Sequence, residues 1–162
     1  MRSHWGKATS LFAAISVFVA GAAIANEAGQ IKVAKGSAIV QRGGQNLAAT
    51  TGMKVQSADV LVTGADGSIG VTFLDNSLVS TGPNSVFAID SYTFDSTTHS
   101  GAFDGSLKRG TLAAVSGKLV KQSPESMRIR TPASIMGVRG TEFVVQVEDP
   151  AGTVAAQKTK RP

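Results

Sequence analysis

The sequence has no cysteine and few of the side chains on which enzyme catalysis most often depends. Its 162 residues include two histidines, one tryptophan and one tyrosine. Without cysteine the chain has no disulfide bonds and no thiolate metal ligands, so packing and hydrogen bonds must hold the fold together. A lipid anchor attached to a cysteine is excluded for the same reason.

The ionisable side chains do not form a recognisable catalytic or metal-binding set. Beyond the N-terminal apolar region the only histidine is His99, and no Gly-x-Ser-x-Gly motif occurs. We interpret His99 as a solvated loop residue. The steps Asp66-Gly, Asp75-Asn and Asp104-Gly are typical of turns, where the carboxylate accepts a backbone hydrogen bond. No calcium-loop spacing is present. We therefore expect no enzymatic activity and no cofactor, metal or catalytic residue.

Long apolar runs are absent except near the N-terminus. Arg2 and Lys7 precede the run Leu11–Ala25, which ends in Ala-Ile-Ala. This pattern predicts a signal-peptide helix, residues 1–25, removed before Asn26, because the run is shorter than the ~20 residues that span a bilayer. The mature protein is then periplasmic or secreted. The alternative retains the run as an anchor, and only in that case do we expect membrane contact.

The excess of positive charge belongs to the two ends of the chain. The net charge is +5, but residues 26–150 contain 11 basic and 11 acidic side chains. Lys158, Lys160 and Arg161 lie in residues 150–162, which we predict to be a disordered basic tail. Because the folded part is neutral and has few aromatic residues, we expect no binding to nucleic acid.

Within the neutral part, charges of opposite sign are separated along the chain. Residues 56–107 contain six aspartates and no lysine or arginine, whereas residues 108–139 contain seven basic residues and one acid, Glu125. Two interpretations are open. The two segments lie side by side and neutralise each other, or they form a dipolar surface that docks a partner.

The remaining pattern is that of short strands separated by turns. Turn signals such as Arg42-Gly-Gly and Asp75-Asn76 recur every eight to twelve residues, without helical periodicity. Val60-Leu-Val-Thr-Gly resembles Leu78-Val-Ser-Thr-Gly. We predict an all-β fold of stacked β-hairpins in a twisted, solenoid-like arrangement. Ser91–Gly105 is expected to be the longest loop or a loose hairpin, and Lys118–Lys121 a strand.

The most informative stretch closes this β region. Residues 128–147 consist of two strand-like segments around a proline and a Gly-Val-Arg-Gly-Thr turn, in which the glycines are expected to provide positive φ or a close backbone approach. Arg139 has two interpretations: a buried clamp paired with Glu142 or a turn aspartate, or a ligand-contacting arginine. The candidate contact residues of this motif are Thr131, Pro132, Arg139, Gly140 and Thr141.

The same stretch resembles a known family. Thr131-Pro-Ala-Ser-Ile-Met-Gly-Val-Arg-Gly-Thr-Glu-Phe is similar to the closing signature of the FecR-type domain of bacterial envelope proteins. The run from Asp59 to Val79 resembles the family's central hairpins, and Gly36-Ser-Ala-Ile-Val-Gln its opening. The resemblance covers roughly residues 31–147 and implies a FecR-type β domain, which we place at residues 26–149.

FecR-type regulators join a cytoplasmic sigma-regulating segment, a membrane span and a periplasmic portion that senses a TonB-dependent receptor. Only ten residues precede the apolar run here, and nothing after Asp149 resembles a docking domain. We therefore expect a non-enzymatic, exported module that binds or senses an envelope protein or a cell-wall glycan. The alternative is a membrane-anchored component of FecR-like cell-surface signalling, which regulates a sigma factor through partners.

Overall fold

The protein folds into strands that lie in two facing layers. The computed structural model describes residues 27–139, 142–148 and 155–157. Strands contain 60% of these residues and a helix 4%, which confirms the all-β prediction. The predicted signal peptide, residues 1–25, and most of the predicted tail lie outside the described residues.

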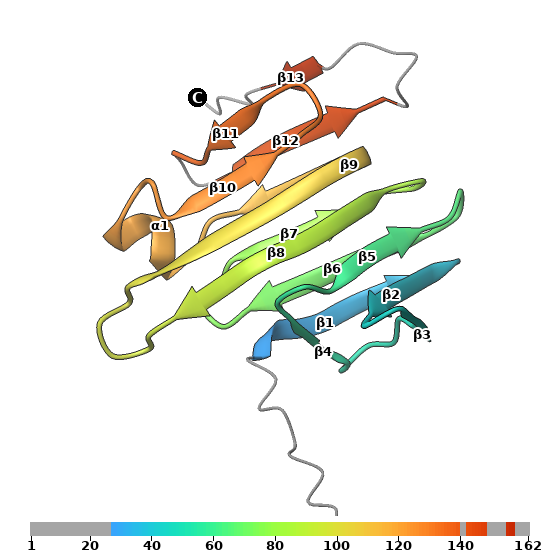
Figure 1. Cartoon of the computed structure of the whole chain (residues 1–162), viewed down its shortest axis with the longest axis horizontal. Coiled ribbons are helices and arrows are strands. Elements are labelled where there is room, and N and C mark those ends of the chain that lie inside the picture. Colours follow the sequence, from blue (N-terminus) through green and yellow to red (C-terminus); the bar gives the residue numbers. More distant parts are fainter. Residues whose placement is uncertain (1–26, 140–141, 149–154, 158–162) are drawn as a thin grey trace, which may run out of the picture.

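The layer nearer the viewer in Figure 1, the front sheet, contains β2 (Ala38–Arg42), β3 (Gln45–Ala48), β5 (Val60–Thr63), β8 (Val86–Phe94), the first part of β9 (Gly101–Val115), β10 (Met127–Arg130) and β11 (Ile135–Gly137). The back sheet contains β1 (Glu27–Lys35), β4 (Lys54–Gln56), β6 (Ser68–Phe73), β7 (Leu78–Thr81), the last part of β9, β12 (Glu142–Val147) and β13 (Ala155–Gln157). The chain passes repeatedly between the layers as it adds strands, which is the twisted, stacked-hairpin arrangement that the sequence predicts.

Strand β9 belongs to both layers and makes them one curled sheet. Its first part pairs with β8, and its last part pairs with β7 and β12. Buried side chains fall on odd positions in the first part, such as Phe103 and Leu107, and on even positions after Gly110, such as Leu112. Gly110 has φ +87°, so the strand changes its inward face at a residue that tolerates left-handed backbone.

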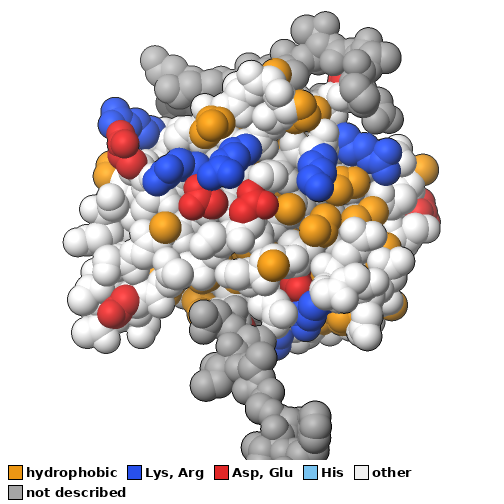
Figure 2. Space-filling model, viewed as in Figure 1, with side chains coloured by type: hydrophobic (Ala, Val, Ile, Leu, Met, Phe, Trp, Pro, Cys, Tyr) orange, Lys and Arg blue, Asp and Glu red, His pale blue; other side chains and the backbone are white. Residues whose placement is uncertain are grey.

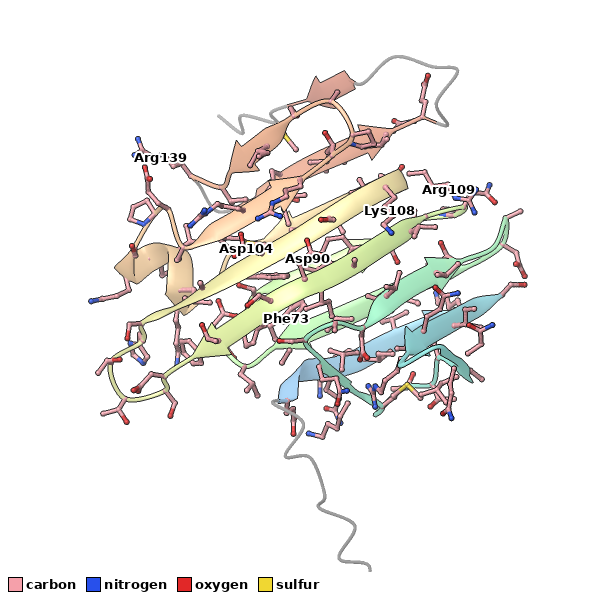
Figure 3. The ribbon with its side chains drawn as sticks, in the orientation of Figure 1. Phe73, Asp90, Asp104, Lys108, Arg109 and Arg139 are labelled. Carbon is pink, nitrogen blue, oxygen red and sulfur yellow. The ribbon has the colours of Figure 1, made fainter. Side chains whose placement is uncertain are left out.

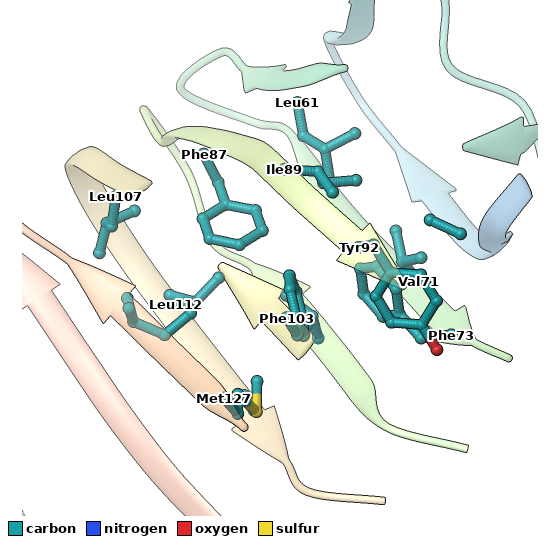
Figure 4. Packing of buried hydrophobic residues seen from close by; sticks show 14 of the residues in the cluster. Leu61, Val71, Phe73, Phe87, Ile89, Tyr92, Phe103, Leu107, Leu112 and Met127 are labelled. Atoms are coloured by element: carbon teal, nitrogen blue, oxygen red, sulfur yellow. The ribbon is translucent and has the colours of Figure 1, made fainter. Parts of the chain in front are cut away.

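The core lies between the two layers and is centred on four aromatic rings (Figure 4). The ring centroids of Phe73 and Phe103 are 4.5 Å apart, and that of Tyr92 lies 5.2 and 5.6 Å from theirs. Phe87 meets the edge of Phe103 at 6.5 Å. These rings come from β6, β8 and β9, so they join the two sheets by packing where a cysteine-free chain has no disulfide bond.

Two predicted hairpin turns are confirmed by their backbone conformation. Gly43 and Gly44 connect β2 to β3 with φ of +55° and +79°. Asn76 lies between β6 and β7 with φ +66°, the left-handed conformation that the Asp75-Asn step indicates. Local turn chemistry therefore placed these reversals correctly.

Of the two expectations for Ser91–Gly105, the hairpin is confirmed and the long loop is wrong. Strand β8 continues to Phe94 and β9 begins at Gly101, which leaves only residues 95–100 as a loop. The polar composition concealed a period-two pattern, because Tyr92 and Phe103 pair across the strands and both point into the core.

The prediction of a strand at Lys118–Lys121 is also wrong, because helix α1 (Lys118–Gln122) occupies this segment. The backbone N–H of Lys118 donates to the carbonyl of Asp75 at 2.8 Å, and that of Leu119 donates to its carboxylate at 3.4 Å. Leu119 and the neighbouring Val120 are both buried, which one helical turn permits at an edge of the sheet.

At the C-terminal side, three residues of the predicted tail, Ala155–Gln157, form β13 against β12. Among the residues that the structure describes, no helix is long and apolar enough to cross a bilayer.

Candidate functional site

Five basic side chains lie across the outer face of the front sheet and at its upper edge (Figures 2 and 3). This basic row consists of Lys108, Arg109, Arg128, Arg130 and Arg139. The side chains of Arg128, Arg130 and Arg139 are 56%, 52% and 74% exposed. Lys108 and Arg109 are exposed as well. The row is therefore open to a ligand from solvent.

The register of β9 and β10 creates the centre of the row. Met127 and Ile129 are buried, so the alternation of a strand directs Arg128 and Arg130 outward. β10 runs parallel to β9, where Arg128 lies beside Asp104 and Arg130 beside Ser106. Lys108, the next outward residue of β9 after Ser106, extends the row along the same face.

A carboxylate lies beneath the two central arginines. Asp104 Oδ1 is 3.9 Å from Arg128 Nε and 3.9 Å from Arg130 Nη2. These separations exceed hydrogen-bond length, and Oδ1 is buried without a hydrogen-bond partner in the described part of the chain. Asp90 on β8 accepts a hydrogen bond from Ser106. Because neither arginine donates a hydrogen bond to Asp104, their guanidinium donors stay available to a second carboxylate or phosphate.

At one end the row borders a polar hollow of about 400 Å³, lined by Pro124, Glu125, Arg128, Gly137 and Arg139. Arg139 Nη2 donates to Glu125 Oε1 at 2.7 Å. Both side chains are more than 70% exposed, so the pair is solvated and separates at little cost.

An exposed apolar side chain accompanies the charges. Ile135 on β11 is opposite Arg130 on β10 and 69% exposed. Paired residues of antiparallel strands share a face, so Ile135 lies on the same side as the row. β11 pairs only with β10 among the described strands, which leaves its second edge unpaired.

The family model described as FecR protein matches residues 59–159, which is more than half of the chain and includes β5 to β13. The chain belongs to the FecR family. Comparisons with curated proteins and with solved structures give no match. Membership associates this FecR domain with cell-surface signalling. The resemblance to the FecR-type domain that the sequence indicated is thereby confirmed.

Of the five motif residues of the FecR domain, the structure describes Thr131, Pro132 and Arg139. Thr131 closes the turn between β10 and β11: its N–H donates to the Ser134 carbonyl at 2.8 Å, and its Oγ1 accepts from the Ser134 N–H at 3.1 Å. Pro132 is exposed in that turn. Gly140 and Thr141 lie outside the described residues. Of the five, only Arg139 belongs to the basic row.

Arg139 does not form the buried clamp of the first interpretation. Its side chain is exposed, and its partner is Glu125, neither Glu142 nor a turn aspartate. Gly137 also differs from expectation, because it has no positive φ and a Cβ there would meet nothing within 4 Å. Gly137 and Arg139 are therefore both open to solvent, while Val138 between them is buried.

The other members of the row were not singled out as site residues from the sequence. The signal was present in the alternation Met127-Arg-Ile-Arg, which predicts two arginines on one outer face if the segment is a strand. The charge-separated segments do lie side by side, but they meet only at Asp104 among the described ion pairs. The aspartates of residues 56–107 therefore do not neutralise all the basic side chains of residues 108–139.

His99 and Asp66, two other ionisable groups considered from the sequence, have local roles. His99, with φ +56°, stacks on Phe94 in the loop between β8 and β9, with ring centroids 6.1 Å apart. The carboxylate of Asp66 accepts from the Ser37 N–H at 3.1 Å, and its hydrogen bonds to Ser37 lower the pKa of Asp66. Asp104 was expected at a turn but lies within β9, so that prediction is wrong.

Metal ligation finds no support in the described ranges. No group of three or more histidine, aspartate or glutamate side chains there is placed to hold a metal ion.

Proposed function

We propose that this FecR domain is a non-enzymatic binding module of the cell envelope whose basic row receives an acidic segment of an envelope protein. The observation behind the proposal is the arrangement of Arg128 and Arg130, two outward guanidinium groups on one short strand beside an exposed isoleucine. Guanidinium groups pair with carboxylates through two parallel hydrogen bonds, which favours planar acidic ligands.

The charge balance of the face supports an acidic partner. The row has five cations, and the acids near it are Asp90, Asp104 and Glu125. One of these, Glu125, forms a largely exposed pair with Arg139, so a stronger ligand can replace it.

The apolar contact supports a peptide ligand in preference to a sugar. Ile135 offers an exposed aliphatic anchor next to Arg130, and the edge of β11 that no described strand occupies can accept a strand by backbone hydrogen bonds. An extended segment with an acidic and an aliphatic residue two positions apart would present both side chains to this face. A cell-wall glycan lacks the aliphatic side chain and the strand edge partner.

The first test measures binding of a short peptide of Glu-Ser-Leu-Ser repeats, which as a strand places glutamate and leucine on one face. We expect affinity that falls as salt is added, and at least a tenfold loss (about 1.4 kcal/mol) in the double variant R128E/R130E. The matched control, K118E/K121E, makes the same change of net charge on α1, whose lysines do not belong to the row. Equal losses in both variants would show general electrostatics and refute a specific site.

The second test identifies the partner in intact cells. A photo-crosslinking residue at position 135 is expected to join the FecR domain to an envelope protein, and R128E/R130E should abolish the adduct while K118E/K121E preserves it. Purified cell-wall sacculi provide the competing arm. Retention on sacculi that depends on Arg128 and Arg130, without any protein adduct, assigns the row to glycan and overturns the proposal.

A further inference from the structure

The outer face of the back sheet, on the opposite side of the molecule from the basic row, is a shallow apolar surface. Four aliphatic side chains are exposed on it: Val33 by 43%, Leu78 by 47%, Val115 by 38% and Val144 by 37%. Between them is a hollow of about 320 Å³ whose lining includes the small residues Gly70 and Ala113. These six residues define the apolar face.

The strand register arranges this face in rows across β1, β6, β7, β9 and β12, with β7 in the centre. One row contains Val33, Gly70, Ser80, Ala113 and Val144. The adjacent row contains Thr72, Leu78, Val115 and Glu142. Residues of one row are direct partners on neighbouring antiparallel strands, so they lie at the same height along the strands.

Opposite charges stand at the two ends of these rows. Lys32 on β1 and Glu142 on β12 both line the hollow. The ammonium of Lys32 donates to the side chain of Gln30, and Gln30 pairs with Thr72. The ammonium therefore lies level with the second row, which contains Thr72 and Glu142. Within the described ranges, neither Lys32 nor Glu142 forms an ion pair.

We propose that a second copy of this chain docks on the apolar face, related by a two-fold axis parallel to β7. That operation keeps the height along the strands and reverses the strand order. Val33 then faces Val144 of the second copy, and Gly70 faces its Ala113. Lys32 of each copy faces Glu142 of the other. The face is complementary to itself in apolar contact and in charge, which favours a second copy over an unrelated partner.

The dimensions of the face set the strength of the dimer. Five strands spaced about 4.8 Å apart give a width of about 20 Å between the outer strands. Stable standard interfaces bury about 800 Å² per partner, so a patch of this width corresponds to the small, reversible class. We expect a dissociation constant on the order of micromolar, with the two sheets packed about 10 Å apart.

Exchange of the two charges tests this geometry. The protein, as the cells produce it, is examined by sedimentation velocity from about 1 µM to about 500 µM, a range that brackets the expected dissociation constant. Wild type is expected to pass from monomer to dimer. K32E and E142K each place like charges opposite each other twice per dimer, and each should raise the dissociation constant at least about tenfold. Circular dichroism confirms that both variants fold.

Mixing provides the decisive measurement. An equimolar mixture of K32E and E142K restores both opposite-charge contacts, so it should dimerise like wild type, as should the double variant K32E/E142K. K121E, which alters an exposed charge on α1 outside the face, should dimerise normally. A wild type that stays monomeric throughout the range, single variants that dimerise as wild type does, or a mixture that remains monomeric each overturns the proposal. A monomer that binds lipid vesicles through this face overturns it as well.

Discussion

The guanidinium of Arg42 binds the carboxylate of Asp59 through two hydrogen bonds, one to each oxygen. Arg42 Nε donates to Oδ1 at 2.8 Å and Nη2 donates to Oδ2 at 2.6 Å, while the side chain of Asp59 is completely buried. The Gln56 N–H also donates to Oδ2 at 2.9 Å. Arg42 donates in addition to the Lys54 carbonyl, so one side chain ties β2 to β4 and to the turn before β5.

Removal of Arg42 should strongly destabilise the domain. R42A leaves the buried Asp59 carboxylate without its cation, and we expect the free energy of unfolding to fall by about 3–5 kcal/mol. Urea unfolding followed by circular dichroism measures this change. K54A is the control, because Lys54 and Glu27 form an exposed pair that should contribute under about 1 kcal/mol. Similar losses in both variants would contradict the role of burial.

The single tyrosine should make stability depend on pH in alkaline solution. Tyr92 Oη donates to Asp75 Oδ1 at 3.1 Å inside the core. Burial and the charge of Asp75 raise the pKa of Tyr92 far above its ordinary value of 10.0. Between pH 10 and the raised pKa, the unfolded chain loses the phenolic proton while the folded chain keeps it. The free energy of unfolding should therefore fall by about 1.4 kcal/mol per pH unit in this range.

Comparison with Y92F isolates this contribution. The variant loses the hydrogen bond to Asp75, so it should be less stable at neutral pH, but the difference from wild type should narrow above pH 10. Absorbance of the phenolate, which only Tyr92 can produce, checks the same shift directly. A phenolate that appears near pH 10 in the folded protein would falsify the prediction.

The bend of β9 should tolerate no side chain at Gly110. A Cβ there would lie 2.2 Å from Ser85 Oγ, and φ is +87°. G110A is therefore expected to cost about 2–4 kcal/mol, from backbone strain together with overpacking. G137A should be nearly neutral in thermal unfolding, because Gly137 lies in open space. Comparable melting temperatures for the two variants would show that the bend is adaptable.

Local chemistry explains which features were predictable. A Gly-Gly or Asp-Asn step permits positive φ at a tight turn, so the turns at Gly43 and Asn76 could be placed without knowledge of the fold. The same local reasoning failed at Asp104, since an Asp-Gly step also occurs inside β9, where Gly105 gives room to the ring of Phe87. A close approach between strands distant in sequence is not encoded in the dipeptide.

The site was less predictable than the fold for a related reason. Arg139 was a candidate from its motif, whereas Arg128 and Arg130 became significant only when β10 was found parallel to β9, beside Asp104. Helix α1 likewise depends on the distant Asp75, which holds its first backbone N–H groups. These relationships join residues more than twenty positions apart, and propensity within a strand does not choose its neighbour.

The amino-acid sequence by itself determined the all-β class, the hairpin turns and membership of the FecR family, because side-chain alternation and backbone preference act over a few residues. Only the tertiary structure decided that Arg42 would neutralise Asp59, that five cations would share one outer face, and that Lys32 and Glu142 would stand at opposite ends of another. Strand pairing brings these groups together, and its free energy comes from burying the whole core at once.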